Sequence, residues 1–262
     1  MGQDDIDFGF REPQRPYDSG SQRARAWTEK WVADWLYCPN CANPYLSQFP
    51  ANMPVADFYC SKCTDEFELK SKKGKFGKTI ANGAYTKKME RLESSNNPNL
   101  MLMSYDDASA RVRDVIVIPK HFFAPSIIQE RPPLSPTARR AGWIGSNIAI
   151  GKIPETGRIA LVREGVIVER QLVLDKWKAT CFLRDQTLEA RGWLPDVLNC
   201  VESFGSRDFT IDEIYAYEAI LSAKYPNNNN VRPKIRQQLQ VLRDQGLVEF
   251  LGRGRYTRRL QV

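Results

Sequence analysis

The sequence predicts a mixed α/β (α+β) domain over residues 1–187, followed by a small domain of helices and a β-hairpin over residues 188–262. Three observations lead to this division. Two pairs of cysteines and several short apolar strands lie in the first part. The last part shows a series of helix signals that ends in a glycine-rich hairpin. The length of 262 residues suits one large or two modest domains.

The composition favours a folded protein over a disordered chain or a membrane-spanning one. Hydrophobic residues make up 42% of the chain and aromatic residues 11%, which is enough for a folded core. No run approaches the roughly 18 apolar residues of a membrane helix, and the N-terminus lacks the pattern of a secretory signal. We therefore expect a cytoplasmic protein without a membrane partner.

The charge is unevenly placed along the chain. The net charge is +7. The segment 231–262 alone holds eight basic and two acidic side chains, a net charge of +6. A concentrated basic face favours a polyanionic partner, nucleic acid first and an anionic membrane second. A merely solvated surface is the alternative.

The predicted elements of the first domain follow from its apolar pattern. Residues 1–20 lack periodicity and are expected to form a loose arm. Trp27, Trp31 and Trp35 recur every four residues and predict an amphipathic helix that ends near Tyr37. A second helix is expected over 83–92, and a proline-rich irregular segment over 119–136. Short apolar runs predict strands over 55–59, 66–70, 100–104, 112–118, 158–162 and 166–168.

Four of the six cysteines have the spacing of a metal site. They form two CxxC pairs, separated by eighteen residues: Cys38, Cys41, Cys60 and Cys63. Two such turns can direct four thiolates at one tetrahedral ion, so the pattern predicts a structural zinc site. Disulfides are disfavoured in a chain without a secretion signal, and a redox dithiol needs only one CxxC pair. Cys181 and Cys200 are interpreted as small buried residues.

The second domain has the helix signals of a winged helix. A helix is expected over 193–201. The segment Thr210–Glu213 is a capping box, and a helix should follow it to about Tyr225. Pro226 and four asparagines interrupt the chain, and Pro233 suits the first turn of a third helix. A hairpin over 247–257 completes the pattern.

Polar side chains on the third helix and the hairpin are candidates for DNA contact. The helix carries Arg236, Gln240 and Arg243, and the hairpin tip carries Arg253 and Arg255. Guanidinium and amide groups bind phosphates and base edges. A winged helix that binds another protein is the alternative.

The second cysteine pair lies inside another motif. Ten residues separate Asp57 from Glu68-Leu-Lys70, and Pro54 precedes Asp57 by three residues. This is the order and spacing of the PD-(D/E)xK nuclease motif. If 55–59 and 66–70 pair as antiparallel strands, Asp57 lies opposite or close to Glu68. Glu68 and Lys70 then share one face.

Two carboxylates and one ammonium group at one place are suited to phosphodiester hydrolysis. Asp57 and Glu68 offer the oxygen ligands that Mg²⁺ prefers, and Lys70 could orient or deprotonate the attacking water. A surface strand with alternating charges is the alternative, because the motif also arises by chance.

Gly77-Lys78-Thr79 lacks the first glycine of a P-loop, so no nucleotide cofactor is expected. His121 is the only histidine and is more consistent with a structural role.

Taken together, these motifs resemble the family of DpnI-like methyl-directed (type IIM) restriction endonucleases. The resemblance extends from about Ser21 to Tyr256. Its motifs lie at 38–41, 54–60, 66–74, 138–145, 235–244 and 252–254.

The resemblance implies a PD-(D/E)xK catalytic domain with a structural zinc, followed by a winged helix. It implies Mg-dependent cleavage of double-stranded DNA at GATC sites whose adenine carries an N6-methyl group. It assigns catalysis to Asp57, Glu68 and Lys70. The methyl-contacting tryptophan of the family corresponds to Trp143, with Arg139 and Arg140 nearby.

Two alternatives stay open. A non-catalytic zinc and winged-helix DNA-binding regulator would explain the charge and the cysteines but not the two carboxylates and the lysine. The other alternative is a PD-(D/E)xK nuclease of the same fold that is blind to methylation, such as a repair enzyme. We expect a monomer in solution, while the oligomeric state during cleavage and the number of active-site metals stay open.

Overall fold

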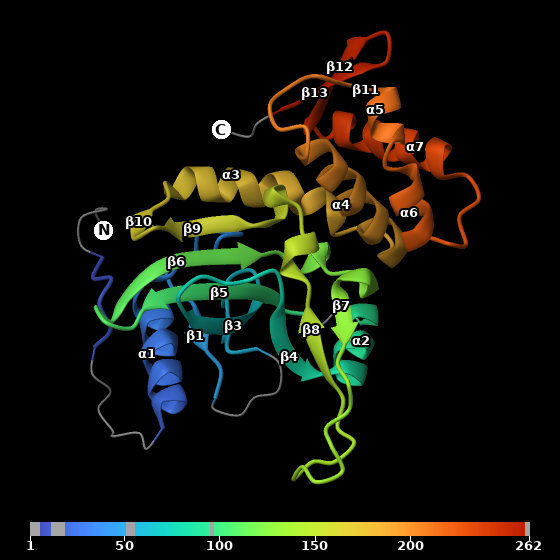
Figure 1. Cartoon of the computed structure of the whole chain (residues 1–262). Coiled ribbons are helices and arrows are strands. Elements are labelled where there is room, and N and C mark those ends of the chain that lie inside the picture. Colours follow the sequence, from blue (N-terminus) through green and yellow to red (C-terminus); the bar gives the residue numbers. More distant parts are fainter. Residues whose placement is uncertain (1–5, 12–18, 51–55, 95–96, 260–262) are drawn as a thin grey trace. The chain divides into compact units, whose positions relative to one another are not determined.

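The computed structural model describes residues 6–11, 19–50, 56–94 and 97–259 (Figure 1). Its tertiary contacts divide the described residues into two compact units. The first unit draws on the segments Met1–Gly77, Asn96–Lys120 and Arg158–Thr180. The second draws on Lys78–Ser95, His121–Gly157 and Cys181–Val262. Within the described part of the chain, no helix is long and apolar enough to cross a membrane.

The first unit is built on a seven-stranded sheet in the order β1-β2-β3-β5-β6-β9-β10. Only the pair β3 and β5 is parallel, and the other neighbours are antiparallel. The strands are β1 Ser47–Gln48, β2 Phe58–Tyr59, β3 Glu66–Lys73, β5 Asn99–Asp106, β6 Arg111–Ile118, β9 Ile159–Arg163 and β10 Val166–Ile167.

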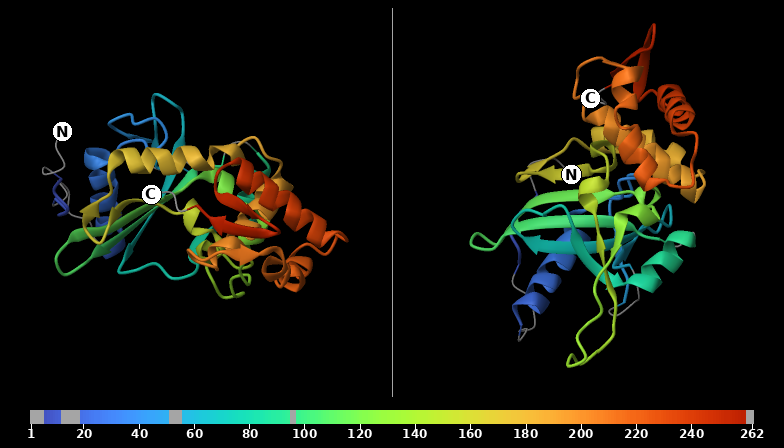
Figure 2. Two further views of the ribbon diagram at one scale, coloured as in Figure 1. Left: turned by 90° about the horizontal axis from the view of Figure 1, so that it is seen from above. Right: turned by 45° about the vertical axis from the view of Figure 1, so that its right-hand side comes forward.

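Burial follows the position of each strand in this sheet. β5 lies at the centre, and all of its residues except the last are buried. Two helices pack on opposite faces of the sheet, α1 (Gly20–Trp35) and α3 (Arg170–Thr180) (Figures 1 and 2). α1 contacts β3, so this helix faces the strand that carries the nuclease motif.

Residues 6–11 differ from the loose arm expected for residues 1–20. Phe8 and Phe10 stack against Trp31 and Trp27 of α1, with ring centroids 6.3 and 5.6 Å apart. The Phe10 N–H also donates to the carbonyl of Ala110. Burial of two aromatic rings offsets the entropy that this segment loses on ordering.

The second unit begins with a three-stranded sheet in the order β4-β8-β7. These strands are Ile80–Ala84, Gly145–Ile148 and Ile128–Glu130, and α2 (Tyr85–Glu93) contacts all three. A loop over 131–144 joins β7 to β8. The sequence predicts a helix where α2 lies, but it predicts no strand at β4, β7 or β8. These three strands are short and mix apolar and polar residues without clear alternation.

The rest of the second unit includes a helix-turn-helix domain with a small sheet in the order β11-β13-β12. Its helices are α4 Leu188–Glu202, α5 Ile211–Tyr215, α6 Glu218–Lys224 and α7 Val231–Asp244. Its strands are β11 Phe209–Thr210, β12 Val248–Gly252 and β13 Arg255–Arg258. The third predicted helix corresponds to α7, which buries an apolar stripe of Ile235, Leu239 and Leu242.

One predicted helix is split. The capping box at Thr210 and Glu213 is present, but the helix expected to continue to Tyr225 stops at Tyr215 and restarts at Glu218. Tyr217 lies at the break, where its hydroxyl is 2.6 Å from that of Ser203 and its ring packs edge-on against Phe204. These tertiary contacts outweigh helix propensity at this point.

Candidate active site and nucleic-acid interface

Asp57, Glu68 and Lys70 line one pocket of about 380 Å³ in the first unit. β2 and β3 are antiparallel, with Phe58 opposite Phe67. The Asp57 N–H continues the ladder by donating to the Phe67 carbonyl at 2.9 Å. This register places Asp57 level with Glu68, as the antiparallel pairing predicted. Pro54 and Val55, the other predicted parts of the motif and its strand, lie outside the described residues.

The three candidate catalytic side chains are oriented by short contacts. The Leu69 N–H donates to Asp57 Oδ2 at 2.8 Å. Lys70 Nζ lies 2.8 Å from Glu68 Oε1. The side chains of Asp57, Glu68 and Lys70 are 24%, 14% and 31% exposed, so all three can be reached from solvent.

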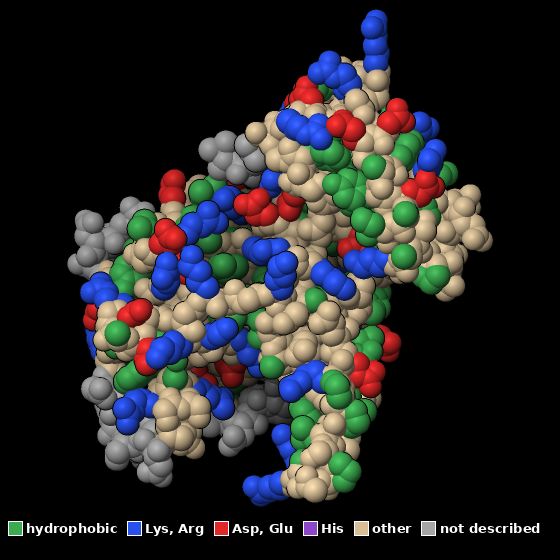
Figure 3. All heavy atoms as spheres, in the orientation of Figure 1, with side chains coloured by type: hydrophobic (Ala, Val, Ile, Leu, Met, Phe, Trp, Pro, Cys, Tyr) green, Lys and Arg blue, Asp and Glu red, His purple; other side chains and the backbone are tan. Residues whose placement is uncertain are grey.

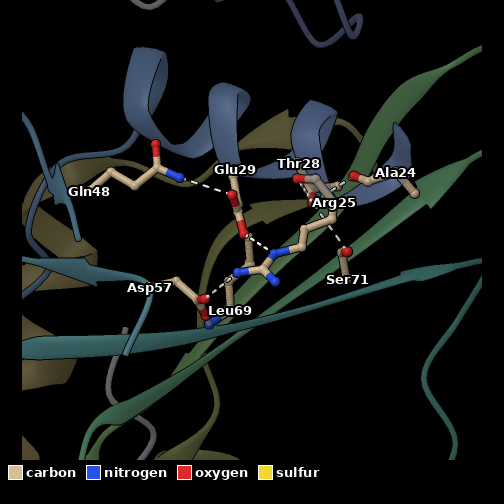
Figure 4. A network of polar contacts seen from close by, with 8 residues as sticks. All are labelled: Ala24, Arg25, Thr28, Glu29, Gln48, Asp57, Leu69 and Ser71. Carbon is tan, nitrogen blue, oxygen red and sulfur yellow. Dashed lines mark hydrogen bonds and ion pairs between the residues drawn. The ribbon is translucent and has the colours of Figure 1, made fainter. Parts of the chain in front are cut away.

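Helix α1 adds a polar network to the same pocket (Figure 4). Arg25 Nη2 lies 3.5 Å from Asp57 Oδ1, and Arg25 Nε donates to Glu29 Oε1. Glu29 Oε2 accepts a 2.9 Å hydrogen bond from Gln48 Nε2. The hydrogen bond to Glu29 and the charge of that carboxylate raise the pKa of Arg25, so this guanidinium is a permanent positive charge.

The donor set of this pocket suits a hard divalent cation. Asp57 and Glu68 supply carboxylate oxygens, and the pocket is polar and open to water. Mg²⁺ is held in proteins by one or two carboxylates while it keeps several waters. Asp57 and Glu68 are therefore the residues that would hold such an ion.

Among the described residues, one group of three or more side chains could hold a metal ion, and it consists of Cys38, Cys41, Cys60 and Cys63. Their sulfur atoms all lie within 4.8 Å of one another. The sulfur atoms of Cys38 and Cys63 are 3.6 Å apart, and those of Cys41 and Cys60 are 3.5 Å apart. Four Zn–S bonds of about 2.3 Å in a tetrahedron place the sulfurs roughly 3.8 Å apart. The thiol cluster therefore fits a structural zinc ion, as the spacing predicted.

The two cysteine turns share one backbone geometry. In each, the first cysteine carbonyl accepts an N–H from the residue four positions later, which is Ala42 in one turn and Thr64 in the other. Both residues have positive φ, 60° and 61°. A left-handed conformation is costly for a β-branched residue such as Thr64. Formation of the metal site would compensate this strain.

Polar contacts surround the thiol cluster. Asn40 Nδ2 donates to Asp65 Oδ2 at 2.7 Å, and Lys120 Nζ lies 3.6 Å from Asp65 Oδ1. Burial raises the pKa of the Cys38 thiol. Burial also acts on Cys60, but backbone N–H groups of Cys63 and Lys62 outweigh it and lower its pKa to about 7. Hydrogen bonds to sulfur favour the thiolate form that binds zinc.

The predicted methyl-contacting residues lie in the 131–144 loop of the second unit. Trp143 is half-buried. Its ring packs over Gly145 and occupies the space that a side chain at residue 145 would need. The guanidinium of Arg140 lies 4.7 Å from the Trp143 ring centroid, and Arg139 is exposed beside it. Trp143 is thus half-buried on a loop rather than fully buried in the core, with Arg140 stacked on its ring.

The helix-turn-helix domain has a groove of about 410 Å³ beside α7. It is lined by Arg236, Gln240 and Arg243 together with two aromatic residues, Phe250 and Tyr256. The structure thus brings the three predicted helix residues together.

The two predicted hairpin residues do not line this groove. Arg253 lies in the turn between β12 and β13 with a φ of 50°, and Arg255 lies 2.8 Å from Asp208. Figure 3 shows Lys and Arg side chains spread over the visible face with Asp and Glu among them, so the net charge of +7 is not one uniform patch on that face.

Sequence reasoning missed the contribution of α1 to the pocket of Asp57, Glu68 and Lys70. Arg25 and Glu29 are four residues apart, which predicts only an ordinary helix ion pair. The available signal was the tryptophan stripe of α1, because residues beside a buried stripe lie close to the sheet it covers. Gln48 had no signal, since β1 is two residues long.

Comparison with known protein families gives two matches. A sequence profile of the Dam-replacing family matches residues 10–186. A profile of the Dam-replacing HTH domain matches residues 189–258. Together the two profiles cover nearly all of the chain.

Proposed function

The chain belongs to the Dam-replacing family, the DpnI-like methyl-directed endonucleases, and on this premise we propose that it is a type II restriction endonuclease that cleaves GATC sites carrying N6-methyladenine. Family membership itself implies a methyl-dependent restriction endonuclease with DNA as its partner. The specific sequence, the Mg²⁺ requirement and the hydrolytic mechanism belong to the proposal. So do a cytoplasmic location, a monomeric state, and domains over residues 1–187 and 188–262.

The observation that carries this proposal is the convergence of Asp57, Glu68 and Lys70 in one solvent-accessible pocket. A non-catalytic regulator has no use for this arrangement. We further propose that the sheet of the first unit has the PD-(D/E)xK fold, with the motif on β3 and the turn before β2.

Each residue then has a role in phosphodiester hydrolysis. Asp57 and Glu68 would hold the divalent cation, which when bound supplies an activated water and shields charge on the phosphate. The Leu69 N–H fixes one oxygen of Asp57 and so limits the rotation of that carboxylate. Lys70 Nζ, paired with Glu68, is an ammonium group placed to orient the water and to stabilise the phosphate charge. The water oxygen forms a bond to phosphorus, and the bond from phosphorus to one sugar oxygen breaks. The water gives up a proton to solvent, and the sugar oxygen leaves as a hydroxyl group that has taken up a proton.

Sequence and methyl recognition would come from the second unit. Adenine presents its N6 amino group in the major groove, so a methyl group on N6 would protrude into that groove. Trp143 could desolvate that methyl group, and Arg139 or Arg140 could contact guanine or phosphate nearby. Arg236, Gln240 and Arg243, with Arg253 and Arg255 of the hairpin, would contact the duplex through the helix-turn-helix domain.

The test uses three short duplexes with the full chain and its zinc. One carries methylated GATC, one unmethylated GATC, and one a methylated adenine in another tetranucleotide. Cleavage only of the first, and only with Mg²⁺ added, supports the proposal. Equal cleavage of the first two would favour a methylation-blind nuclease, and binding without cleavage would favour a regulator.

A further inference from the structure

In the nuclease pocket, which is the pocket lined by Asp57, Glu68 and Lys70, each of the two candidate metal-binding carboxylates faces an internal cation. Glu68 pairs with Lys70. Asp57 has one oxygen, Oδ2, fixed by the Leu69 N–H, and its other oxygen, Oδ1, faces Arg25. The Asp57 oxygen best placed to bind a metal ion is therefore the one that Arg25 contacts.

Arg25 is held in this position by a chain of contacts that begins on the sheet. Gln48 of β1 donates to Glu29, and Glu29 accepts the Nε–H of Arg25 (Figure 4). The side chain of Arg25 is 59% exposed. Because an ion pair of so exposed an arginine contributes little, Arg25 can leave it and rotate into water at low cost, in contrast to a buried arginine.

We propose that Arg25 is an internal counter-ion that competes with the catalytic divalent cation for Asp57 while DNA is absent. The inference rests on the proposed function, because it takes Asp57 as a ligand of that cation. A guanidinium and a divalent cation a few ångströms apart repel each other, so the cation binds more tightly once Arg25 has moved away.

The charges of the pocket agree with such an exchange. Its lining holds Glu29, Asp57 and Glu68 against Arg25 and Lys70, a net charge of −1. A divalent cation added with Arg25 in place makes the pocket +1, and the departure of Arg25 returns it to zero. A DNA phosphate is the natural acceptor for the released guanidinium, because arginine binds phosphate with two parallel hydrogen bonds. DNA would thus favour metal loading.

The experiment measures Mn²⁺ binding to the DNA-free, zinc-containing full chain by electron paramagnetic resonance. Mn²⁺ binding that is lost in Glu68→Ala defines the signal of this pocket. We expect Arg25→Ala to bind Mn²⁺ about three- to tenfold more tightly than the wild type, the range of one partly exposed ion pair plus the relieved repulsion. Arg23→Ala is the matched control, because Arg23 is an exposed arginine on the same helix that does not line the pocket.

The outcomes separate this inference from the proposed function. Unchanged or weaker Mn²⁺ binding in Arg25→Ala, or equal tightening in Arg23→Ala, overturns the counter-ion role while leaving the metal site intact. Mn²⁺ binding that does not depend on Glu68 in any variant overturns the metal assignment itself. Melting temperatures within a few degrees of the wild type verify that the exposed substitutions leave the fold unchanged.

Discussion

Lys70 and Lys73 lie on the same strand, yet only Lys70 faces the nuclease pocket. Lys70 pairs with Glu68, whereas Lys73 pairs with the exposed Asp107 at 2.8 Å. The difference follows from the two-residue period of a strand, which puts Glu68 and Lys70 on one face. At the scale of single residues, this periodicity places Glu68 and Lys70 together, and the register of β2 and β3 adds Asp57 to the proposed active site.

The first residue-scale prediction concerns catalysis. Glu68→Ala and Lys70→Ala should each lower the rate of DNA cleavage by about 10²–10⁴-fold, because each removes a group that acts on the reacting phosphate or its water. Binding of methylated duplex, measured by fluorescence anisotropy, should change little. Lys73→Ala is the control and should cleave at the wild-type rate. Full activity in Glu68→Ala would remove Glu68 from the active site.

The second residue-scale prediction concerns methyl recognition. Trp143→Ala should reduce the preference for methylated over unmethylated duplex by about fourfold, since burial of one methyl group is worth about 0.8 kcal/mol. Trp143→Phe should keep most of the preference because it retains an aromatic face. The measurement is the ratio of the two binding constants. An unchanged ratio in the alanine variant would exclude Trp143 from methyl recognition.

At the scale of elements, the sequence was most informative where a local rule determines structure. The tryptophan period located α1, the capping box located the start of α5, and Pro233 located the first turn of α7. The split between α5 and α6 could not be foreseen, because it depends on the contacts of Tyr217 with residues earlier in the chain. For the same reason Arg25 and Glu29 were not assigned to the pocket, which only the packing of α1 against β3 reveals.

The end of α4 gives an element-scale prediction within the second unit. Glu202 accepts hydrogen bonds from the N–H groups of Glu155 and Thr156 and from the Thr156 hydroxyl, and it lies 3.5 Å from Arg258. Its side chain is only 9% exposed. Glu202→Ala should therefore lower the free energy of unfolding by about 2–3 kcal/mol, because it leaves these donors without their acceptor.

Glu189 near the other end of α4 provides the control for that measurement. Its side chain is 69% exposed and lies 3.7 Å from Lys234. Such surface pairs contribute little, so Glu189→Ala should change the unfolding free energy by less than about 1 kcal/mol. Urea denaturation followed by tryptophan fluorescence compares the two variants. Equal effects would show that the contacts of Glu202 do not stabilise the fold.

At the scale of the whole molecule, the cysteine cluster connects α1 to the strands of the nuclease pocket. The first cysteine turn follows α1 directly, and the second joins β2 to β3. Asp57 and Glu68 stand on either side of that second turn. A metal ion that fixes both turns would thus also fix the distance between the two carboxylates.

Zinc content and stability test this connection. The purified chain should contain one zinc, and its removal with a chelator should lower the melting temperature and abolish cleavage, since zinc binding of this kind contributes directly to folding. Cys63→Ser should lose the zinc, whereas Cys181→Ser should retain it, because Cys181 is not part of the cluster. Full stability and activity without zinc would contradict a structural role for the cluster.

The most direct test of the central claim is digestion of a single plasmid prepared from two bacterial hosts, one that methylates adenine in GATC and one that does not. With Mg²⁺ present, we expect the wild-type chain to cut only the methylated plasmid, into the fragments that its GATC sites define. The Glu68→Ala variant should leave both plasmids intact. Equal cutting of the two plasmids, or cutting of the unmethylated one alone, would contradict a methyl-directed endonuclease.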